Sequence, residues 1–229
     1  MESKSLVIFK VGETFSGLAE QMGDFDRWII DRIGPLPVPV TVIDPRRGDE
    51  LPDFRNVAAA IVTGSHAMVT DRAHWSEKLA EWLRSATAQY LPILGICYGH
   101  QLLAHALGGD VGFHPIGIEL GTVSIRLTED GKDDALFGSM PEEFLAHVVH
   151  HQSVLRLPER AVLLASNAFE PHHAFRVGDS AWGVQFHPEF SRNAMSGYIK
   201  ELTEASKLGG TSQAPSGEVL ATADAVSIL

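Results

Sequence analysis

The sequence predicts an α/β fold, a three-layer sandwich in which a mostly parallel central sheet is covered by helices on both faces. Strand-like and helix-like segments alternate through the first half of the 229 residues, and these strands are apolar without alternation, as strands buried on both faces are. The second half is dominated by short strand-like segments between turn residues, which predicts a small antiparallel addition. The composition, 45% hydrophobic and 21% charged, is that of an ordinary globular protein.

The first half is expected to contain four strands and three helices. Apolar side chains recur at spacings of three and four residues from 17 to 33, which predicts one amphipathic helix. Gly108 and Gly109 are expected to end the last helix of this half. The remaining segments are strands at 5–12, 39–44, 57–64 and 91–96 and helices at 75–90 and 98–107.

The second half is expected to be mainly β-structure, with a brief helical stretch at 134–137 and a final helix at 192–207. We therefore expect one domain over residues 1–207. Residues 208–229 are rich in Gly, Ser, Ala and Thr without a sustained period, which predicts a flexible C-terminal tail. The strand-like segments cover 121–130, 144–158, 161–168, 173–178 and 181–187.

Charge and cysteine content narrow the classes of partner and compartment. A net charge of −11 without a local cluster of Lys or Arg disfavours nucleic acid. Lys10 interrupts the first apolar run, which is too short for a signal peptide or a membrane span, so we expect no membrane partner and a cytoplasmic location. A single cysteine excludes an internal disulfide and a Cys-x-x-Cys site, in keeping with a reducing compartment.

The one cysteine lies in Gly95-Ile-Cys97-Tyr-Gly99, between a predicted strand and a predicted helix. This pattern is typical of a nucleophile elbow, in which glycines two positions either side allow a sharp strand-to-helix reversal. Cys97 would then lie at a helix N-terminus, where free N–H groups favour a thiolate. The alternative is that Cys97 is a small buried hydrophobic residue, as most lone cysteines are.

A thiolate nucleophile requires a partner that can hold and deliver a proton, most often histidine. His187 follows an apolar strand in "GVQFHPEF" and would emerge at the same sheet edge as Cys97 if the two strands are parallel neighbours. Pro188 favours an extended backbone at His187, and residues two apart in an extended segment project to the same side. Glu189 could therefore orient the imidazole, although His-Pro-Glu could also be an ordinary surface turn.

The segments "GICYGHQLLAHALGG" and "GVQFHPEF" together resemble the two signature segments of class I glutamine amidotransferases, and the Cys-Tyr-Gly-x-Gln form is similar to that of GMP synthase. The resemblance covers about residues 6–205 and implies a flavodoxin-like fold. It implies that Cys97 is the nucleophile, His187 the general acid and base, and Glu189 its orienting carboxylate. Proteins of the intracellular protease-like class carry histidine directly after the nucleophile, where this sequence has Tyr98.

The same resemblance implies an oxyanion hole and a substrate pocket. One backbone donor would be Tyr98, and the other comes in the family from a Gly-Gly-Pro loop, which here reads Gly64-Ser65-His66 and so departs from the pattern at two positions. We therefore expect Gly64 and Ser65 at the oxyanion hole with an altered pocket shape. Gln101, His151, Gln152 and Ser153 are expected to contact the substrate.

The implied reaction releases ammonia from the glutamine side chain through a γ-glutamyl thioester, with no metal or cofactor. Too few residues follow the last predicted strand for a fused synthetase domain, and no phosphate-binding Gly-x-x-x-x-Gly-Lys loop occurs. The protein could act alone or supply a separate synthetase subunit. The alternatives are a γ-glutamyl peptide or amide hydrolase, which the altered loop would suit, and a non-catalytic regulatory module with the same fold.

Overall fold

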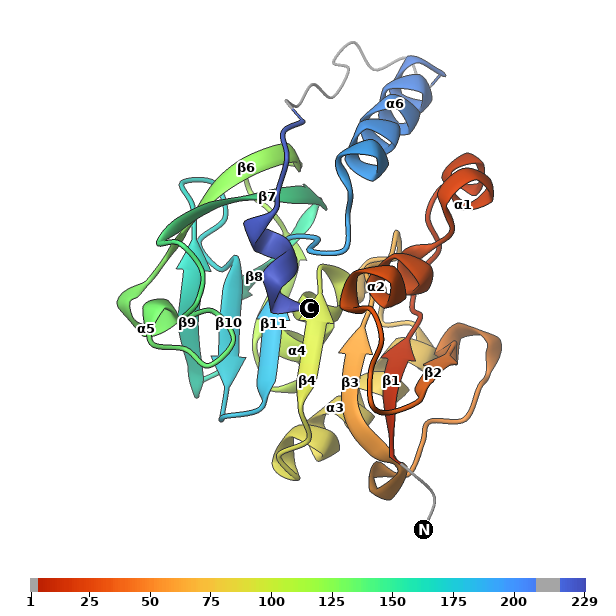
Figure 1. Cartoon of the computed structure of the whole chain (residues 1–229), viewed down its shortest axis with the longest axis vertical. Helices are drawn as coiled ribbons and strands as arrows, with labels where there is room; N and C mark the ends of the chain where they lie inside the picture. The colour runs from red at the N-terminus through yellow and green to blue at the C-terminus, as the bar shows by residue number, and fades with distance from the viewer. Residues whose placement is uncertain (1–3, 209–218) are drawn as a thin grey trace.

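The computed structural model describes residues 4–208 and 219–229. Its centre is a sheet of nine strands in the order β2-β1-β3-β4-β11-β10-β9-β6-β7 (Figure 1). The first five strands in this order are parallel, and each of the last four runs antiparallel to its neighbours. The α/β class, the parallel part and the antiparallel addition are therefore confirmed.

The parallel strands are β2 (Val40–Ile43), β1 (Ser5–Phe9), β3 (Val57–Val62), β4 (Ile93–Ile96) and β11 (Ala181–Val184). The antiparallel strands are β10 (Ala174–Val177), β9 (Ala161–Ser166), β6 (Glu119–Leu127) and β7 (Glu143–His150). A separate ribbon pairs β5 (Asp110–Phe113) with β8 (Gln152–Arg156). The helices are α1 (Ser16–Met22), α2 (Phe25–Ile33), α3 (His74–Ala88), α4 (Tyr98–Ala106), α5 (Glu129–Lys132) and α6 (Arg192–Leu208).

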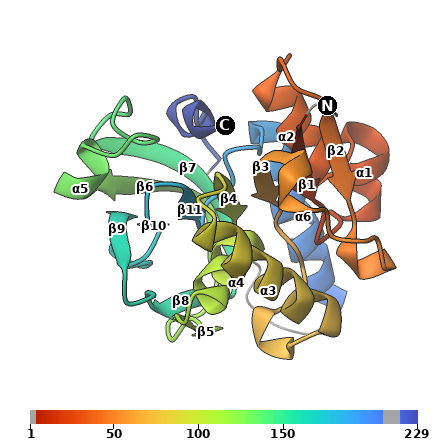
Figure 2. The same ribbon diagram turned by 90° about the horizontal axis from the view of Figure 1, so that it is seen from below.

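Helices cover both faces of the sheet, with α3 and α4 on one face and α2 on the other (Figure 2). Alternate residues of β1 project to opposite faces of the sheet. Val7 and Phe9 pack with α3 and α4, whereas Leu6 and Ile8 pack in the core that contains Ile29 of α2. A third cluster joins α1, α2 and α6 beyond the carboxyl ends of the parallel strands (Figure 1). This third cluster covers the edge of the sheet at which functional residues were expected. None of the described helices combines the length and apolarity that a bilayer crossing needs.

Three element predictions require correction. The helix expected over 17–33 is two helices, because Gly23 takes a φ of +81° and Asp24 starts α2 by accepting a hydrogen bond from the N–H of Phe25. The strand expected over 144–158 is two strands, β7 and β8, which belong to different sheets. The short helix expected at 134–137 lies instead at α5, where Thr128 accepts from the N–H of Gly131.

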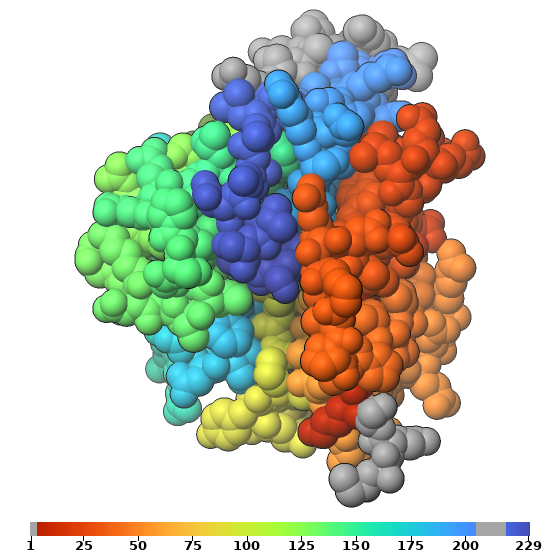
Figure 3. Space-filling model, in the orientation of Figure 1, coloured from red at the N-terminus to blue at the C-terminus, as the bar shows by residue number. Residues whose placement is uncertain are grey.

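The flexible tail predicted for 208–229 is wrong for its last part, while residues 209–218 lie outside the described residues. A 3-10 turn at Asp224–Ile228 packs against the sheet, with Ala225 and Ile228 buried in the same core as α2. Figure 3 shows this segment in dark blue between the green and the orange parts of the molecule. Apolar residues widely spaced in the sequence, rather than a periodic pattern, hold it there. The boundary of the domain at residue 207 stays a prediction.

His100 on α4 is expected to make the protein less stable in acid. Its ring is fully buried beside Phe175, with centroids 4.9 Å apart, and burial lowers its pKa to about 3, helped by neighbouring histidines. The unfolded protein therefore binds a proton that the folded protein excludes. As the pH falls from 7.5 to 5, we expect this residue to cost about 2 kcal/mol of the free energy of unfolding.

Urea unfolding at pH 7.5 and pH 5 measures this effect. His100→Asn should lose about 2 kcal/mol less stability over this pH interval than the wild type does. His74→Asn provides the control, because His74 is an exposed histidine on α3. Equal pH dependence of His100→Asn and the wild type would show that His100 does not titrate in this way.

Candidate active site

Cys97 lies in the sharp turn between β4 and α4, with a φ of +49° and a ψ of −98°. The two flanking glycines are required by contacts rather than by φ. A Cβ on Gly95 would lie 2.4 Å from the carbonyl oxygen of Gly99, and a Cβ on Gly99 would lie 2.5 Å from that of Val62. The helix can approach the sheet this closely only without these side chains. A strained non-glycine residue at a strand-to-helix turn is typical of a site where a side chain must be presented.

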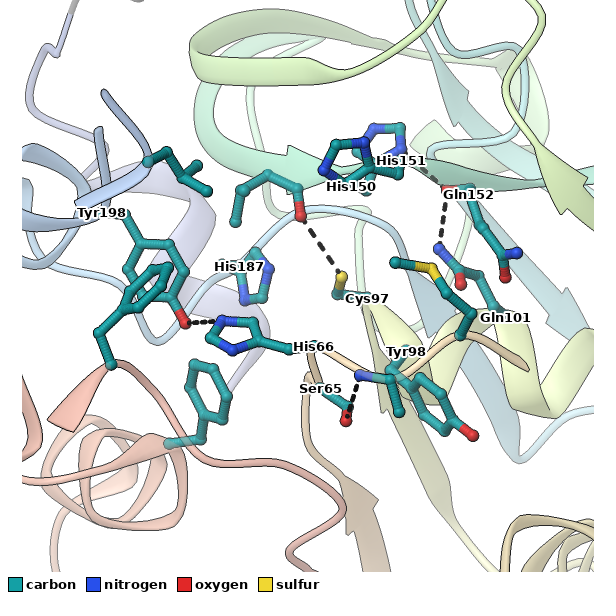
Figure 4. Close-up of a pocket in the computed structure, with 16 residues that line it drawn as sticks. Ser65, His66, Cys97, Tyr98, Gln101, His150, His151, Gln152, His187 and Tyr198 are labelled. Atoms are coloured by element: carbon teal, nitrogen blue, oxygen red, sulfur yellow. Dashed lines mark hydrogen bonds between the residues drawn. The ribbon is translucent and has the colours of Figure 1, made fainter. Parts of the chain in front are cut away.

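The topology brings His187 to Cys97. Strands β4 and β11 are parallel neighbours with Ile96 opposite Val184, so both segments leave the sheet at the same edge. The N–H of Cys97 donates to the carbonyl oxygen of Val184 at 2.8 Å. Figure 4 shows the His187 ring beside the Cys97 sulfur. Gly64 lies under both side chains, because a Cβ there would be 2.9 Å from Cε1 of His187 and 3.8 Å from Cβ of Cys97.

Glu189 fixes one nitrogen of His187. Nδ1 of His187 and Oε1 of Glu189 are 2.8 Å apart, and both side chains are buried. Nε2 has no hydrogen-bond partner of regular geometry among the described residues, so it is the nitrogen available on the side of Cys97. Burial lowers the pKa of His187, but Glu189 and then Cys97 favour the charged ring more strongly, and the net pKa is well above its ordinary value. These surroundings therefore favour the protonated form of the ring, which can donate a proton.

Two residues that line the cavity with Cys97 have backbone N–H groups available as donors. The N–H groups of Tyr98, at the start of α4, and of Ser65, after β3, have no hydrogen-bond partner among the described residues. The hydroxyl of Ser65 accepts from the N–H of Ala67 at 3.1 Å, which holds this loop in a turn. Two free N–H groups near a nucleophile are the arrangement that an oxyanion requires.

Three of the four residues that were expected to contact the substrate line one cavity. Gln101 and Gln152 line the cavity of about 230 Å³ in front of Cys97, and His151 lines it from an exposed position. Nε2 of Gln101 donates to the carbonyl oxygen of Gln152 at 2.8 Å and to Gln185 at 3.0 Å, which leaves only its oxygen for a ligand. Oε1 of Gln152 has no partner among the described residues.

Ser153 lies outside this cavity, which argues against the expected contact with substrate. Its side chain is buried and its hydroxyl donates to Oε2 of Glu170. The sequence alone could not show this, because Gln152 and Ser153 point to opposite sides of β8, and the register of that strand decides which of them faces the cavity.

Sequence reasoning missed the aromatic side of the cavity. Phe15, Phe25 and Tyr198 line it together with His66, and they come from the start of α1, from α2 and from α6. Nε2 of His66 is 3.0 Å from the hydroxyl oxygen of Tyr198 (Figure 4). The departure of the Gly64-Ser65-His66 loop from the family pattern was the one signal that pointed here.

Buried polar groups support the floor of the cavity beneath Gln152. Nδ1 of His150 bonds the carbonyl oxygen of Gln152 at 3.0 Å, and Nε2 lies 2.9 Å from Oε2 of Glu119. Asn167 donates to the other oxygen of Glu119 at 2.8 Å. Burial raises the pKa of Glu119, but hydrogen bonds from His150 and His173 outweigh it, so the carboxylate stays charged. This network fixes the strand that carries Gln152.

With the fold and this geometry established, comparison with known sequences identifies the family. Residues 19–202 match the family described as glutamine amidotransferase class-I. The match covers well over half of the sequence, and the protein therefore belongs to the class I glutamine amidotransferases.

Relatives with similar sequences carry three kinds of name. A glutamine amidotransferase-like protein of Schizosaccharomyces pombe is 32% identical over 66% of this chain, and gamma-glutamyl peptidase 3 of Arabidopsis thaliana is 32% identical over 67%. The GMP synthase (glutamine-hydrolyzing) of Aeropyrum pernix is 34% identical over 66%. The aligned part spans 60%, 63% and 27% of these relatives, respectively.

Solved structures share the fold. A glutamine amidotransferase from Thermotoga maritima superimposes with a TM-score of 0.71 at 20% identity, covering 92% of this protein and 86% of that one. One from Methylobacillus flagellatus gives a TM-score of 0.70 at 22% identity, covering 99% and 86%. The flavodoxin-like architecture expected from the resemblance is therefore confirmed.

Proposed function

We propose that this protein hydrolyses the amide bond of the glutamine side chain through a γ-glutamyl thioester on Cys97. The observation that carries the proposal is the juxtaposition at one sheet edge of three groups: a strained cysteine, a histidine whose Nε2 has no partner among the described residues, and a carboxylate 2.8 Å from its Nδ1. These are the parts that covalent catalysis by a thiolate requires. A regulatory module would need none of them.

In the first step the sulfur of Cys97 bonds to the γ-carbonyl carbon of the substrate. The carbonyl oxygen becomes an oxyanion, for which the N–H groups of Tyr98 and Ser65 are the donors. Nε2 of His187 then gives its proton to the leaving nitrogen, the C–N bond breaks and ammonia departs. Glu189 keeps the ring oriented throughout, because Nδ1 is held at 2.8 Å.

In the second step water replaces the amine. Neutral His187 removes a proton from the water, which attacks the thioester carbon, and glutamate leaves as the thiolate is restored. Gln101 presents an oxygen acceptor to the amino-acid end of the substrate, where an α-ammonium group would need one, because both of its N–H groups are already used. The ammonia could be used by a separate synthetase subunit.

A second candidate reaction uses the same groups on a larger substrate. The side of the cavity next to His187 is apolar and extends to the exposed His66, so it offers room beyond an ammonia molecule. A γ-glutamyl amide or peptide would release an amine there by the same chemistry. The relative named gamma-glutamyl peptidase 3 supports keeping this reaction beside glutamine hydrolysis.

Hydroxylamine trapping tests the proposed intermediate. We expect the purified protein, given hydroxylamine, to convert glutamine and a γ-glutamyl amide to γ-glutamyl hydroxamate and glutamate. Because both substrates pass through one thioester, the ratio of hydroxamate to glutamate should be the same for both. A ratio that depends on the leaving group, or no turnover of either substrate, would contradict the proposal.

A further inference from the structure

The position of the proton donor divides the cavity into two sides. Nε2 of His187 must reach the leaving nitrogen, so the leaving group lies on the His187 side of Cys97 and the amino-acid end lies on the other. Figure 4 shows the two sides: Gln101, Gln152 and His151 lie on one side of Cys97, and His187, His66 and Tyr198 lie on the other. The side chains near His187 therefore decide which amine can leave.

Phe15, Phe25, His66 and Tyr198 form this side of the cavity and are called the aromatic wall below. Their rings are packed on one another: the centroid of Phe15 is 4.8 Å from that of His66 and 5.0 Å from that of Tyr198. Phe25 connects the wall to the proton donor, because its ring stacks on His187 at 6.4 Å with an interplanar angle of 24°. The wall is thus built from four separate segments and is continuous with the reactive pair.

The polar atoms of the wall satisfy each other. Removal of water raises the pKa of Tyr198, so its hydroxyl keeps its proton and can donate to Nε2 of His66 at 3.0 Å. Loss of hydration lowers the pKa of His66, and the charged His187 lowers it further. His66 is accordingly a neutral ring at neutral pH. The face that the wall presents to the cavity is aromatic and uncharged.

The surroundings exclude a charged leaving group. None of the described residues that line the cavity is a Lys, Arg, Asp or Glu. The carboxylate of a leaving amino acid would have no Lys or Arg to pair with, and the His187 ring is already engaged by Glu189 and directed at the leaving nitrogen. The ammonium of a leaving diamine would have no carboxylate among these lining residues. His66 is exposed although its ring packs on Phe15 and Tyr198, so the wall reaches the surface of the protein at this residue.

We propose that the aromatic wall binds the body of the leaving amine, and that the substrate is a γ-glutamyl amide of an uncharged aromatic amine. This inference rests on the proposed function. The sulfur of Cys97 bonds to the γ-carbonyl carbon, the C–N bond breaks with its electron pair going to nitrogen, and His187 supplies the proton. The neutral amine leaves along the wall, and water then releases glutamate.

Three substrates that differ only in the leaving amine test this inference. We expect kcat/KM for γ-glutamylbenzylamide to exceed that for γ-glutamylethylamide by about tenfold or more, because the added ring is buried against aromatic side chains. γ-Glutamylglycine should be the poorest of the three, since its carboxylate meets no Lys or Arg among the described lining residues. Amine release is followed for each substrate over a range of concentrations.

Variants of His66 assign the effect to the wall. His66→Ala should lower the ratio of the benzylamide to the ethylamide kcat/KM by about fivefold, and His66→Phe should restore it, because the ring is what contacts the amine. Because both substrates are measured with the same preparation of a variant, a lower fraction of active enzyme does not change the ratio of the two kcat/KM values. His74→Ala, at an exposed histidine of α3, provides the matched control and should leave the ratio unchanged.

Failure of this inference can be told apart from failure of the proposed function. Turnover of glutamine with a benzylamide to ethylamide ratio of one or less would overturn the inference and leave the thioester mechanism standing. A ratio that His66→Ala does not change would overturn the role of His66. No turnover of any γ-glutamyl substrate, and no hydroxamate, would overturn both.

Discussion

Replacing Cys97 by serine is expected to reduce kcat/KM for glutamine by about 10⁴-fold or more. Serine fills nearly the same volume, but its hydroxyl does not form a stable anion next to the His187 imidazolium. The reaction would then have to begin from a neutral nucleophile. Because the side chain is small and the turn is unchanged, we expect the fold to remain. Ammonia release and hydroxamate formation should be lost together.

The controls for this variant follow from the sequence. Cys97 is the only cysteine, so a thiol reagent can label the native wild-type protein at no other site, and inactivation should parallel labelling. The serine variant should show unchanged thermal unfolding. Turnover by Cys97→Ser within tenfold of the wild type would exclude Cys97 as the nucleophile.

Replacing Gly99 by alanine is expected to destabilise the fold by about 3 kcal/mol or more. The added methyl group would lie 2.5 Å from the carbonyl oxygen of Val62 and 2.8 Å from its Cβ, both in β3, an internal strand of the sheet. Neither atom can move without distorting the sheet, so α4 would have to shift outward. The change should appear as a lower urea midpoint and as lost activity.

Gly17 offers a matched control, because the same substitution there is expected to raise the stability of the protein. It lies in α1, and a Cβ there would be 3.5 Å from Oε1 of Glu201, an ordinary contact. Gly17→Ala should therefore stabilise the protein by about 0.5 kcal/mol through helix propensity. If Gly99→Ala unfolds at the same urea concentration as Gly17→Ala, the close approach of α4 to β3 is not essential.

The placement of Cys97 and His187 at one sheet edge was predictable, because local sequence determines the conformation of both segments. The glycines around Cys97 indicate a turn that residues with side chains cannot make. The strands that precede Cys97 and His187 are apolar on both faces, which predicts that both strands lie inside the parallel part of the sheet. Two parallel neighbours bring their carboxyl ends to one edge. The pair therefore follows from short segments and one rule of topology.

The rest of the site depends on contacts between distant segments. Phe15 and Tyr198 are 183 positions apart in the sequence, and nothing in either segment indicates that their rings meet at 5.0 Å. The apolar spacing continues from α1 into α2, but the positive φ of Gly23 ends the first helix there. The turn at 224–228 is held in place by the burial of Ala225 and Ile228 against distant segments, whereas the composition of this region predicted a flexible tail.

The pairing of β4 with β11 fixes the positions of Cys97 and His187, whereas the residues of the aromatic wall do not depend on it. The distance from sulfur to imidazole is set by one inter-strand spacing of about 4.8 Å, whereas the wall is contributed by side chains from surface helices and a loop. Exchanges at positions 15, 66 and 198 could thus redirect the enzyme toward new amines over evolutionary time. The arrangement of Cys97, His187 and Glu189 beneath them would be inherited intact.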